Sequence, residues 1–232
     1  MVKRNQICSA TAIVVAAGNS LRMNNLNKQF ILLNNIPILA HTLLKFQNSA
    51  LVKNIIVVTK PENILTVNDI VREFDISKVS DIIPGGETRQ ASVMCGLEHV
   101  DECDVIAVHD GARPFVSTKK IDESILAANK FGAVALGIPS KDTVKIIDEN
   151  EVVSETPHRE SIRLIQTPQS FQKDLLKLAY IRAAESGFSG TDDCSVVEHS
   201  NIPVKIIDGE YTNIKITTPE DLPLAEAIYN ID

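Results

Sequence analysis

Short runs of β-branched and other apolar residues alternate with longer amphipathic stretches along the first 140 positions of the chain. The apolar runs lack regular polar alternation, which is typical of strands buried on both faces of a parallel sheet. They predict strands at 11–17, 54–60, 79–85, 104–110 and 132–138. Between these runs, apolar residues recur at helical spacing, as at 38–49 and 88–100. This order predicts an α/β fold with a mostly parallel central sheet and helices on both of its faces.

The pattern changes after the fifth predicted strand. Residues 143–157 contain two short β-prone runs around a polar turn, which predicts a β-hairpin arm. The remaining pattern predicts helices at 173–186, 192–200 and 218–230, and strands at 204–210 and 213–218. No internal repeat or low-complexity linker interrupts it. We therefore expect residues 1–232 to form a single Rossmann-like domain from which the 143–157 arm protrudes.

Composition narrows the classes of function. The chain has 232 residues, 44% of them hydrophobic, and no apolar run approaches the roughly 18–20 residues of a membrane span. No signal peptide is expected, and the four cysteines lack CxxC spacing, which favours reduced thiols in a cytoplasmic protein. A net charge of −7 argues against a general nucleic-acid binder. It leaves room for a small phosphorylated substrate, because a few local cations suffice to bind one.

The stretch AIVVAAGNSLRM (12–23) begins as a buried strand and ends in small, polar and basic residues. A dinucleotide-binding loop requires GxGxxG and a Walker loop requires GxxxxGK[ST], and neither motif is present. Small residues let backbone N–H groups approach an anion, and Arg22 and Lys28 follow closely. A triphosphate cradle and a plain strand-to-helix turn both remain open on these residues alone.

Two further stretches follow predicted strands. In PGGETRQASV (84–93), the glycine pair permits close backbone approach to a flat base, and Ser92 can reach a base edge. The alternative is a glycine turn with Arg89 on the surface of a helix. In AVHDGARPF (107–115), Asp110 ends a strand at the edge where α/β sheets bind ligands. It can bind a metal or a hydroxyl beside Arg113, or only cap a helix, and His109 is expected to be structural.

The second half of the chain adds isolated polar residues. IPSKDTVK (138–145) contributes Thr143, and PHRESIRLIQTPQSF (157–171) contributes Arg159, Arg163 and Thr167. In GTDDCSVVEHS (190–200), Thr191 is expected to be the N-cap, with Asp192 and Asp193 as helix-start acids. Lys215 lies within a β-prone run, where a lysine is costly unless it meets an anion or solvent.

Taken in order, the motifs AIVVAAGNSLRM, KQF, GGETRQASV, HDGARPF, KDTVK, TPQSF, TDD and NIKITTPEDL resemble those of the 2-C-methyl-D-erythritol 4-phosphate cytidylyltransferase family. The resemblance covers nearly the full length of the chain. It implies transfer of CMP from CTP to the polyol phosphate, which gives 4-diphosphocytidyl-2-C-methyl-D-erythritol and pyrophosphate in non-mevalonate isoprenoid precursor synthesis. The ribitol-5-phosphate cytidylyltransferases, which make CDP-ribitol, are a sister family and remain an alternative. A non-catalytic nucleotide-binding protein is a third.

The resemblance also implies a role for each matched residue. The expected catalytic residues are Arg22 and Lys28, which would stabilise the pentacoordinate α-phosphate, and Arg159 and Lys215, which would position the acceptor phosphate. The expected nucleotide-binding residues are Ala16, Ala17, Gly18, Gly86, Glu87 and Ser92. The expected substrate-binding residues are Asp110, Arg113, Thr143 and Thr167, with Asp110 also near a metal. Mg²⁺ or another divalent cation is expected to bind with CTP. A homodimer is expected in which the arm brings Arg159 to the neighbouring site.

Overall fold

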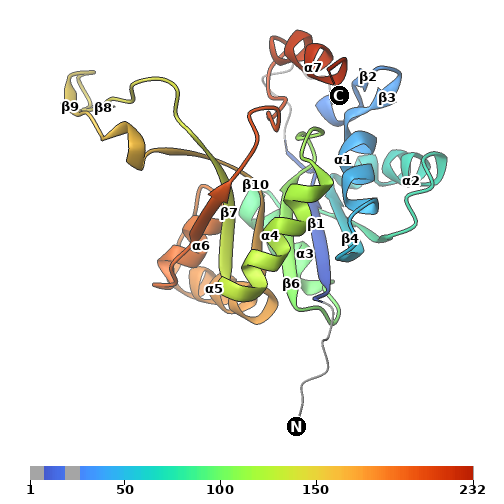
Figure 1. Cartoon of the computed structure of the whole chain (residues 1–232). Coiled ribbons are helices and arrows are strands. Elements are labelled where there is room, and N and C mark those ends of the chain that lie inside the picture. The colour runs from blue at the N-terminus through green and yellow to red at the C-terminus, as the bar shows by residue number, and fades with distance from the viewer. Residues whose placement is uncertain (1–7, 19–26, 232) are drawn as a thin grey trace.

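The central feature of the fold is one seven-stranded sheet with the strand order β11–β7–β10–β6–β1–β4–β5. The computed structural model describes residues 8–18 and 27–231 (Figure 1). The strands of this sheet are β1 (Ala10–Val15), β4 (Val52–Thr59), β5 (Val79–Pro84), β6 (Val105–Asp110), β7 (Ala133–Pro139), β10 (Arg163–Gln172) and β11 (Lys205–Asp208). All of them run parallel except β10, which lies antiparallel between β6 and β7. The expected α/β fold with a mostly parallel sheet is therefore confirmed.

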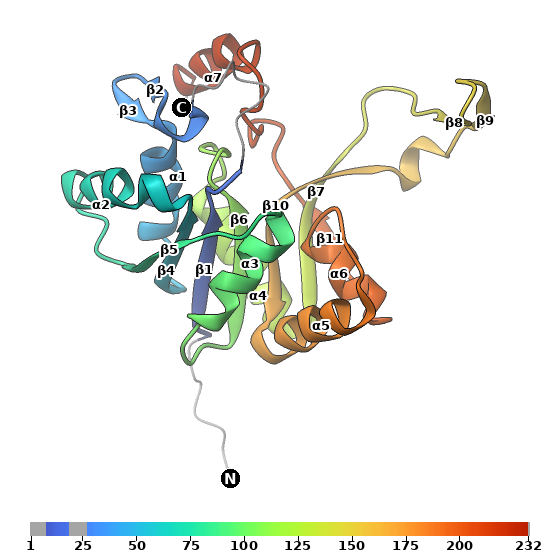
Figure 2. The ribbon, with the colours of Figure 1, turned by 180° about the vertical axis from the view of Figure 1, so that it is seen from behind.

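Helices cover both faces of this sheet (Figures 1 and 2). Side chains from α1 (Ile38–Gln47), α2 (Ile64–Glu73) and α4 (Thr118–Phe131) pack on one face. Side chains from α3 (Arg89–Glu98), α5 (Lys173–Ser186) and α6 (Asp193–His199) pack on the other. Strand β1 serves both layers, because Ala12 and Val14 point to the first face while Ile13 and Val15 point to the second. Continuous apolar strands thus result from burial on both sides.

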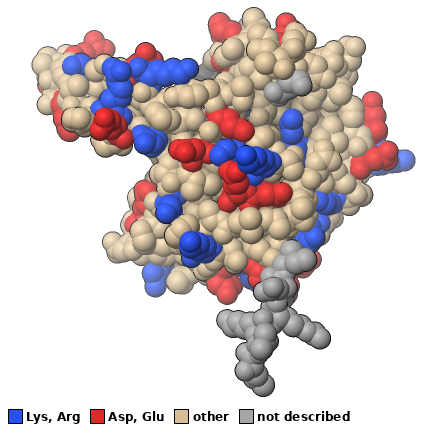
Figure 3. Space-filling model, in the orientation of Figure 1, with Lys and Arg blue, Asp and Glu red and all other residues tan. Residues whose placement is uncertain are grey.

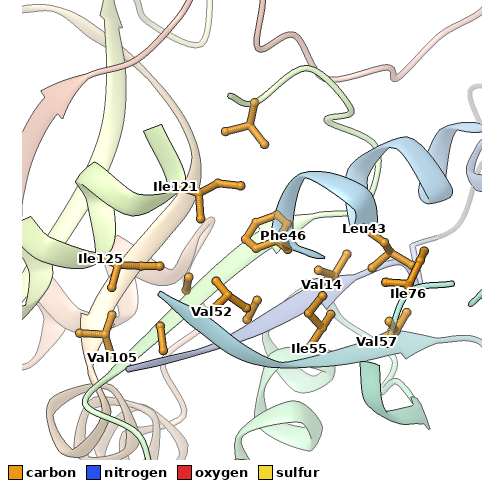
Figure 4. Close-up of a cluster of buried hydrophobic side chains, with 14 of the residues drawn as sticks. Val14, Leu43, Phe46, Val52, Ile55, Val57, Ile76, Val105, Ile121 and Ile125 are labelled. Carbon is orange, nitrogen blue, oxygen red and sulfur yellow. The ribbon is translucent and has the colours of Figure 1, made fainter. Parts of the chain in front are cut away.

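The first of the two core layers is drawn in Figure 4. Leu43 and Phe46 of α1 are fully buried and belong to the same cluster as Val14 and Ile55 of the sheet. Burying each such side chain contributes about 1.5–3 kcal/mol relative to leaving it in water. This packing fixes the sheet, and with it the edge at which β1, β4, β5 and β6 end.

Two smaller substructures lie at that edge. The hairpin of β2 (Leu32–Leu33) and β3 (Ile36–Pro37) lies near the last helix, α7 (Asp221–Tyr229), in both views (Figures 1 and 2). A small cluster around Leu33, Ile38, Phe115 and Ile228 packs them together.

None of the helices within 8–18 and 27–231 is long and apolar enough to cross a lipid bilayer.

The predicted arm is present as an antiparallel hairpin of β8 (Ile146–Ile147) and β9 (Val153–Glu155). It extends well beyond the body of the molecule from the ends of β7 and β10 (Figure 1). Its apolar side chains are exposed, with Ile147 at 52% and Val153 at 51% of full accessibility. The short helical turn η4 (Arg159–Ser161) leads from the hairpin back to β10.

The elements differ from expectation in three places. The polar stretch that contains Thr167 is strand β10, whose strand character the sequence pattern did not predict. The run 213–218, expected to be a strand, forms a loop without strand pairing. Helix α6 has Asp192 as its N-cap, in a capping box with Ser195, so the expected Thr191 cap is wrong.

Candidate active site

The candidate site lies where the order of the sheet changes direction. The chain proceeds from β1 outward to β4 and β5 and then returns to place β6 on the other side of β1. Val15, the last residue of β1, is in register with Asp110, the last residue of β6. In open α/β sheets, ligands bind in the crevice beyond the carboxyl ends of strands at such a point. A cavity of about 530 Å³ lies there, within the usual size of a small-molecule site.

The described part of this cavity wall contains eight of the residues that the sequence predicted. They are Ala17, Gly18, Lys28, Gly86, Glu87, Ser92, Asp110 and Lys215. The short turn η2 (Lys28–Phe30) places Lys28 on one wall, and the loop after β5 forms another. Residues from five separate segments of the chain therefore converge on one pocket. Ala16 lies just below it, buried, with its N–H donated to Val58 O.

The glycine pair after β5 allows two loops to approach closely. A Cβ on Gly85 would lie 2.6 Å from the Cβ of Ala17 and 2.7 Å from the Ser92 hydroxyl oxygen. A Cβ on Gly86 would lie 2.6 Å from the Cβ of Ala91. The Ser92 hydroxyl donates to two backbone carbonyl oxygens, Thr88 O at 2.9 Å and Gly86 O at 3.3 Å. These contacts connect α3 to the glycine loop. The close approach of the glycine loop to Ala17 and Ala91 therefore requires residues without a Cβ at positions 85 and 86. Both glycines line the cavity.

Asp110 is the electrostatic centre of the site. Its Oδ1 accepts a hydrogen bond from Arg89 Nε at 3.2 Å, and its Oδ2 lies 2.8 Å from Lys215 Nζ. Arg113 Nε lies 3.7 Å from the same Oδ2. Burial by itself raises the pKa of Asp110, but the charges of Arg89 and Lys215 outweigh it and hold that pKa well below its usual range. Asp110 is therefore an anion surrounded by cations.

The Arg89 guanidinium joins this centre to a second, fully buried carboxylate. Its NH2 group donates to Asp193 Oδ2 at 2.8 Å, and the Tyr180 hydroxyl donates to Asp193 Oδ1 at 2.6 Å. Burial alone lowers the pKa of Arg89, but Asp193 and Asp110 raise it above its ordinary value, so the charge is retained. Asp193 lies in the first turn of α6, as expected, and its side chain also pairs with Arg89.

The buried side chains of His109 and Thr167 form hydrogen bonds to the backbone of Arg113 and Asp110. His109 Nε2 lies 3.1 Å from Arg113 O, a pure acceptor, so this nitrogen carries the proton. The Thr167 hydroxyl then donates to Nδ1 at 3.0 Å and accepts from Asp110 N at 3.1 Å. Burial lowers the pKa of His109 to about 4, so the ring is neutral. His109 has the structural role that was expected, while the Thr167 hydroxyl is committed internally and lies off the cavity.

A comparison with known proteins decides between the families that share these motifs. The family model described as 2-C-methyl-D-erythritol 4-phosphate cytidylyltransferase (IspD) matches residues 10–230. The chain belongs to this family. The proteins of that name from Caldanaerobacter subterraneus subsp. tengcongensis and Clostridium novyi are each 44% identical, over 94% of this chain and 97% and 95% of their own.

Solved structures of the cytidylyltransferase family share the fold at full length. The 4-diphosphocytidyl-2C-methyl-D-erythritol synthase of Anaerococcus prevotii matches with a TM-score of 0.86 at 35% identity, covering 96% of both chains. The 2-C-methyl-D-erythritol 4-phosphate cytidylyltransferase of Thermus thermophilus matches with a TM-score of 0.79 at 32% identity, covering 96% of this chain and 99% of that one. The resemblance predicted from the motifs is confirmed.

Arg159 and Thr143, two further residues predicted for this cytidylyltransferase, lie together away from the main cavity. Arg159 donates to the Thr143 hydroxyl oxygen at 3.1 Å, and both line a separate cavity of about 430 Å³ at the base of the arm. Arg113 donates to Asn213 O at 2.8 Å and so braces the loop that carries Lys215. Arg22 lies outside the described residues.

Sequence reasoning missed a glutamine in the cavity wall. Gln29 is 3% exposed, and its Oε1 has no hydrogen-bond partner among the described residues. A buried amide oxygen without a partner costs about 1–3 kcal/mol. Gln29 directly follows Lys28 in the KQF motif, so the second polar residue of that motif was the available signal.

The predicted metal role of Asp110 is not favoured by its contacts. Each of its oxygens is already paired with a cation, and in the described part of the chain no three His, Cys, Asp or Glu residues group so as to hold a metal ion. Mg²⁺ is usually held by one or two carboxylates together with substrate phosphates. The protein groups described here do not form such a site by themselves.

Proposed function

We propose that this chain transfers CMP from CTP to 2-C-methyl-D-erythritol 4-phosphate, releasing pyrophosphate. The observation that supports this most directly is the convergence of Lys28, Lys215 and the glycine loop on one cavity. The glycine loop offers backbone and Ser92 at one end, suited to a base. The lysines offer positive charge suited to phosphates. A nucleotide and a second phosphorylated substrate can therefore share the pocket.

The reaction needs no protein nucleophile. A phosphate oxygen of the acceptor attacks the α-phosphorus of CTP in line, a new P–O bond forms, and the bond to pyrophosphate breaks. Catalysis then rests on positioning and on fixed charges where negative charge accumulates. Lys28, together with Arg22, is the proposed source of charge at the α-phosphate. Lys215, held by Asp110, is the proposed contact to the acceptor phosphate.

This concentration of cations explains how an acidic protein handles anionic substrates. The net charge is −7, and acidic and basic side chains are interspersed over the face of the molecular body in Figure 3. No broad basic face is needed, because the cations that matter lie around Asp110 and at Lys28. The electric field of a few cations in a partly desolvated cavity acts on a bound anion more strongly than the distant surface charges do.

The arm supports the proposal of a homodimer. The cavity at its base contains Arg159 and Thr143 but is separate from the main cavity of the same chain. The exposed apolar side chains of the hairpin, Ile146, Ile147, Val152 and Val153, offer a surface for a second copy. If the arm crosses to that copy, Arg159 reaches the acceptor phosphate in the neighbouring site. Asp110 and Thr143 keep their proposed substrate-binding roles within this arrangement.

A divalent cation, Mg²⁺ or a similar ion, is proposed to arrive with CTP, bound chiefly by the phosphate oxygens. It would neutralise part of the triphosphate charge. The cytoplasmic location also remains a proposal, drawn from the four cysteines, which are all unpaired.

The deciding experiment measures pyrophosphate release from CTP with 2-C-methyl-D-erythritol 4-phosphate or ribitol 5-phosphate. We expect release with the first acceptor and at least about a hundredfold lower kcat/KM with the second, because a site built around one set of hydroxyls leaves polar groups unpaired with another. Faster release with ribitol 5-phosphate would assign the chain to the alternative activity. Binding of CTP without release with either acceptor would indicate a non-catalytic nucleotide-binding protein.

A further inference from the structure

We propose that Arg89 is a positioning residue that orients Asp110, so that Lys215 is held facing the acceptor phosphate. This inference rests on the proposed function and concerns residues that the expected catalytic set does not include. Arg89 lies on the first turn of α3, Asp110 at the end of β6 and Asp193 at the start of α6. A single guanidinium thus connects three elements from distant parts of the chain.

Two nitrogens of Arg89 contact different carboxylates. Nε contacts Asp110 Oδ1 at 3.2 Å, and NH2 contacts Asp193 Oδ2 at 2.8 Å. Because Oδ1 is occupied by Arg89, Oδ2 remains for Lys215 Nζ at 2.8 Å. The side chain of Lys215 is 37% exposed and lines the cavity, so its remaining N–H groups are available to a ligand. Arg89 therefore determines which face of the carboxylate Lys215 meets.

Asp193 is a rigid anchor for Arg89. Its side chain is fully buried, and its other oxygen accepts from Tyr180 of α5. Its backbone N–H, like that of Cys194, donates to Gln169 Oε1, at 3.0 and 3.1 Å. Both oxygens of this buried carboxylate are thus occupied, and Asp193 holds Arg89 from a position outside the cavity wall.

The charges of the group favour an anionic ligand. Arg89, Arg113 and Lys215 contribute three positive charges, and Asp110 and Asp193 contribute two negative ones, which leaves one positive charge in excess. Loss of Arg89 removes that excess and leaves Asp110 to be shared by Lys215 and Arg113. Without Arg89 at Oδ1 the carboxylate can rotate, and Lys215, which pairs with it at 2.8 Å, can follow it away from the acceptor phosphate.

A purely structural role for Arg89 must be separated from this one. A buried carboxylate without its partner is strongly destabilising, so Arg89→Gln alone can fail simply because Asp193 is left unpaired. The double variant Arg89→Gln/Asp193→Asn removes both charges, and the new glutamine and asparagine can hydrogen-bond with each other. The excess of one positive charge is also restored. Its stability should be close to that of the parent protein, while Asp110 has lost its orienting partner.

The experiment measures thermal unfolding, CTP affinity by calorimetry, and kcat and KM for the acceptor in full-length protein. For the double variant we expect near-parental unfolding, CTP affinity within about twofold, and kcat/KM for the acceptor lower by about tenfold to a hundredfold. Arg89→Lys keeps the charge but has one nitrogen for two carboxylates, so a stable protein with a similar loss is expected. Arg72→Gln, at an exposed position of α2, is the matched control and should leave every value unchanged.

Three results would overturn the inference. Parental kcat/KM in the double variant would mean that Arg89 only neutralises Asp193. Parental kcat/KM in Arg89→Lys would mean that bridging is unimportant, and this test holds even if the double variant does not fold. A loss of CTP affinity equal to the loss of kcat/KM would make Arg89 a nucleotide ligand instead. Failure of the parent protein to release pyrophosphate would instead reject the proposed function.

Discussion

The ammonium nitrogen of Lys215 lies 2.8 Å from Oδ2 of Asp110, although one residue ends a central strand and the other lies in a loop near the C-terminus. That loop is fixed by Asn213, which is fully buried and donates from Nδ2 to Thr167 O at 2.9 Å. Gln166 adds a hydrogen bond to Asn213 O at 3.2 Å. A lysine without a strand to support it is thereby given a defined position at the cavity.

Replacement of Lys215 is expected to impair use of the acceptor. Lys215→Ala removes a preorganised cation, which typically costs about 10²–10³ in rate. We expect kcat/KM for the acceptor phosphate to fall by this factor, with a smaller change in CTP affinity, measured by pyrophosphate release and calorimetry. Lys119→Ala, a lysine whose side chain is 82% exposed on α4, is the control. An equal loss in both variants would contradict the assignment of Lys215.

The cations proposed at the α-phosphate should affect turnover more than stability. Lys28→Ala and Arg22→Ala are each expected to lower kcat by about 10²–10³, since the charge they supply is needed most in the transition state. Unfolding temperature should remain near that of the parent protein. Near-parental kcat in both variants would remove them from the catalytic set.

The glycine loop offers a steric test. Gly85→Ala places a methyl group 2.6 Å from the Cβ of Ala17, so the two loops must separate. We expect CTP affinity to fall by about tenfold and the free energy of unfolding to fall by about 1–3 kcal/mol, as for other overpacked sites. Adding Ala17→Gly removes the facing methyl group and should recover part of both losses. If the second change recovers nothing, contact between the two loops is not the cause.

A site completed by the arm of a second copy predicts complementation. Arg159→Ala and Lys28→Ala proteins should each be poorly active, but mixing them under conditions of subunit exchange should form hybrid dimers. Half of the dimers are then hybrid and each has one intact site, which yields about a quarter of the parental activity. Absence of any recovery, with exchange verified by differently tagged chains, would indicate that the site is not shared.

His109 should make the protein less stable as the pH falls. Its pKa is lowered from 6.5 to about 4 by burial, so the unfolded chain takes up a proton between these values that the folded protein does not. The free energy of unfolding therefore decreases as the pH falls through this window, by about 3 kcal/mol in total. Below about pH 4 both states bind the proton and this contribution no longer changes. His109→Gln should flatten the dependence in denaturant titrations between pH 4 and 6.5, and an unchanged slope would refute it.

The strands that end at the site were predictable from local pattern. The apolar runs that became β1, β4, β6 and β7 are largely buried on both faces, and that burial selects continuous β-branched sequence. The run that became β5, at the edge of the sheet, is only partly buried. The glycines after β5 and Asp110 at the end of β6 were recognisable because they lie where such runs end. The hairpin arm was visible because its polar turn separates two β-prone runs.

Strand β10 was not predictable in this way. Its centre contains Gln166, Thr167 and Gln169, whose side chains are buried and polar. Each is satisfied by distant groups: Gln166 by Glu210 and Asn213, Thr167 by His109, and Gln169 by Asp192. Burial of such residues depends on partners that only the assembled fold supplies.

The sequence by itself determined the alternation of strands and helices up to β7, most of the segments that border the pocket and the family to which the chain belongs. The reason is that these follow from short-range periodicity and from motifs in a fixed order. Only the tertiary structure decided that Arg89 connects Asp110 to Asp193 and that Lys215 faces the same carboxylate. A charge pair between distant segments leaves no periodic signal, because its free energy depends on the distance and burial that folding creates.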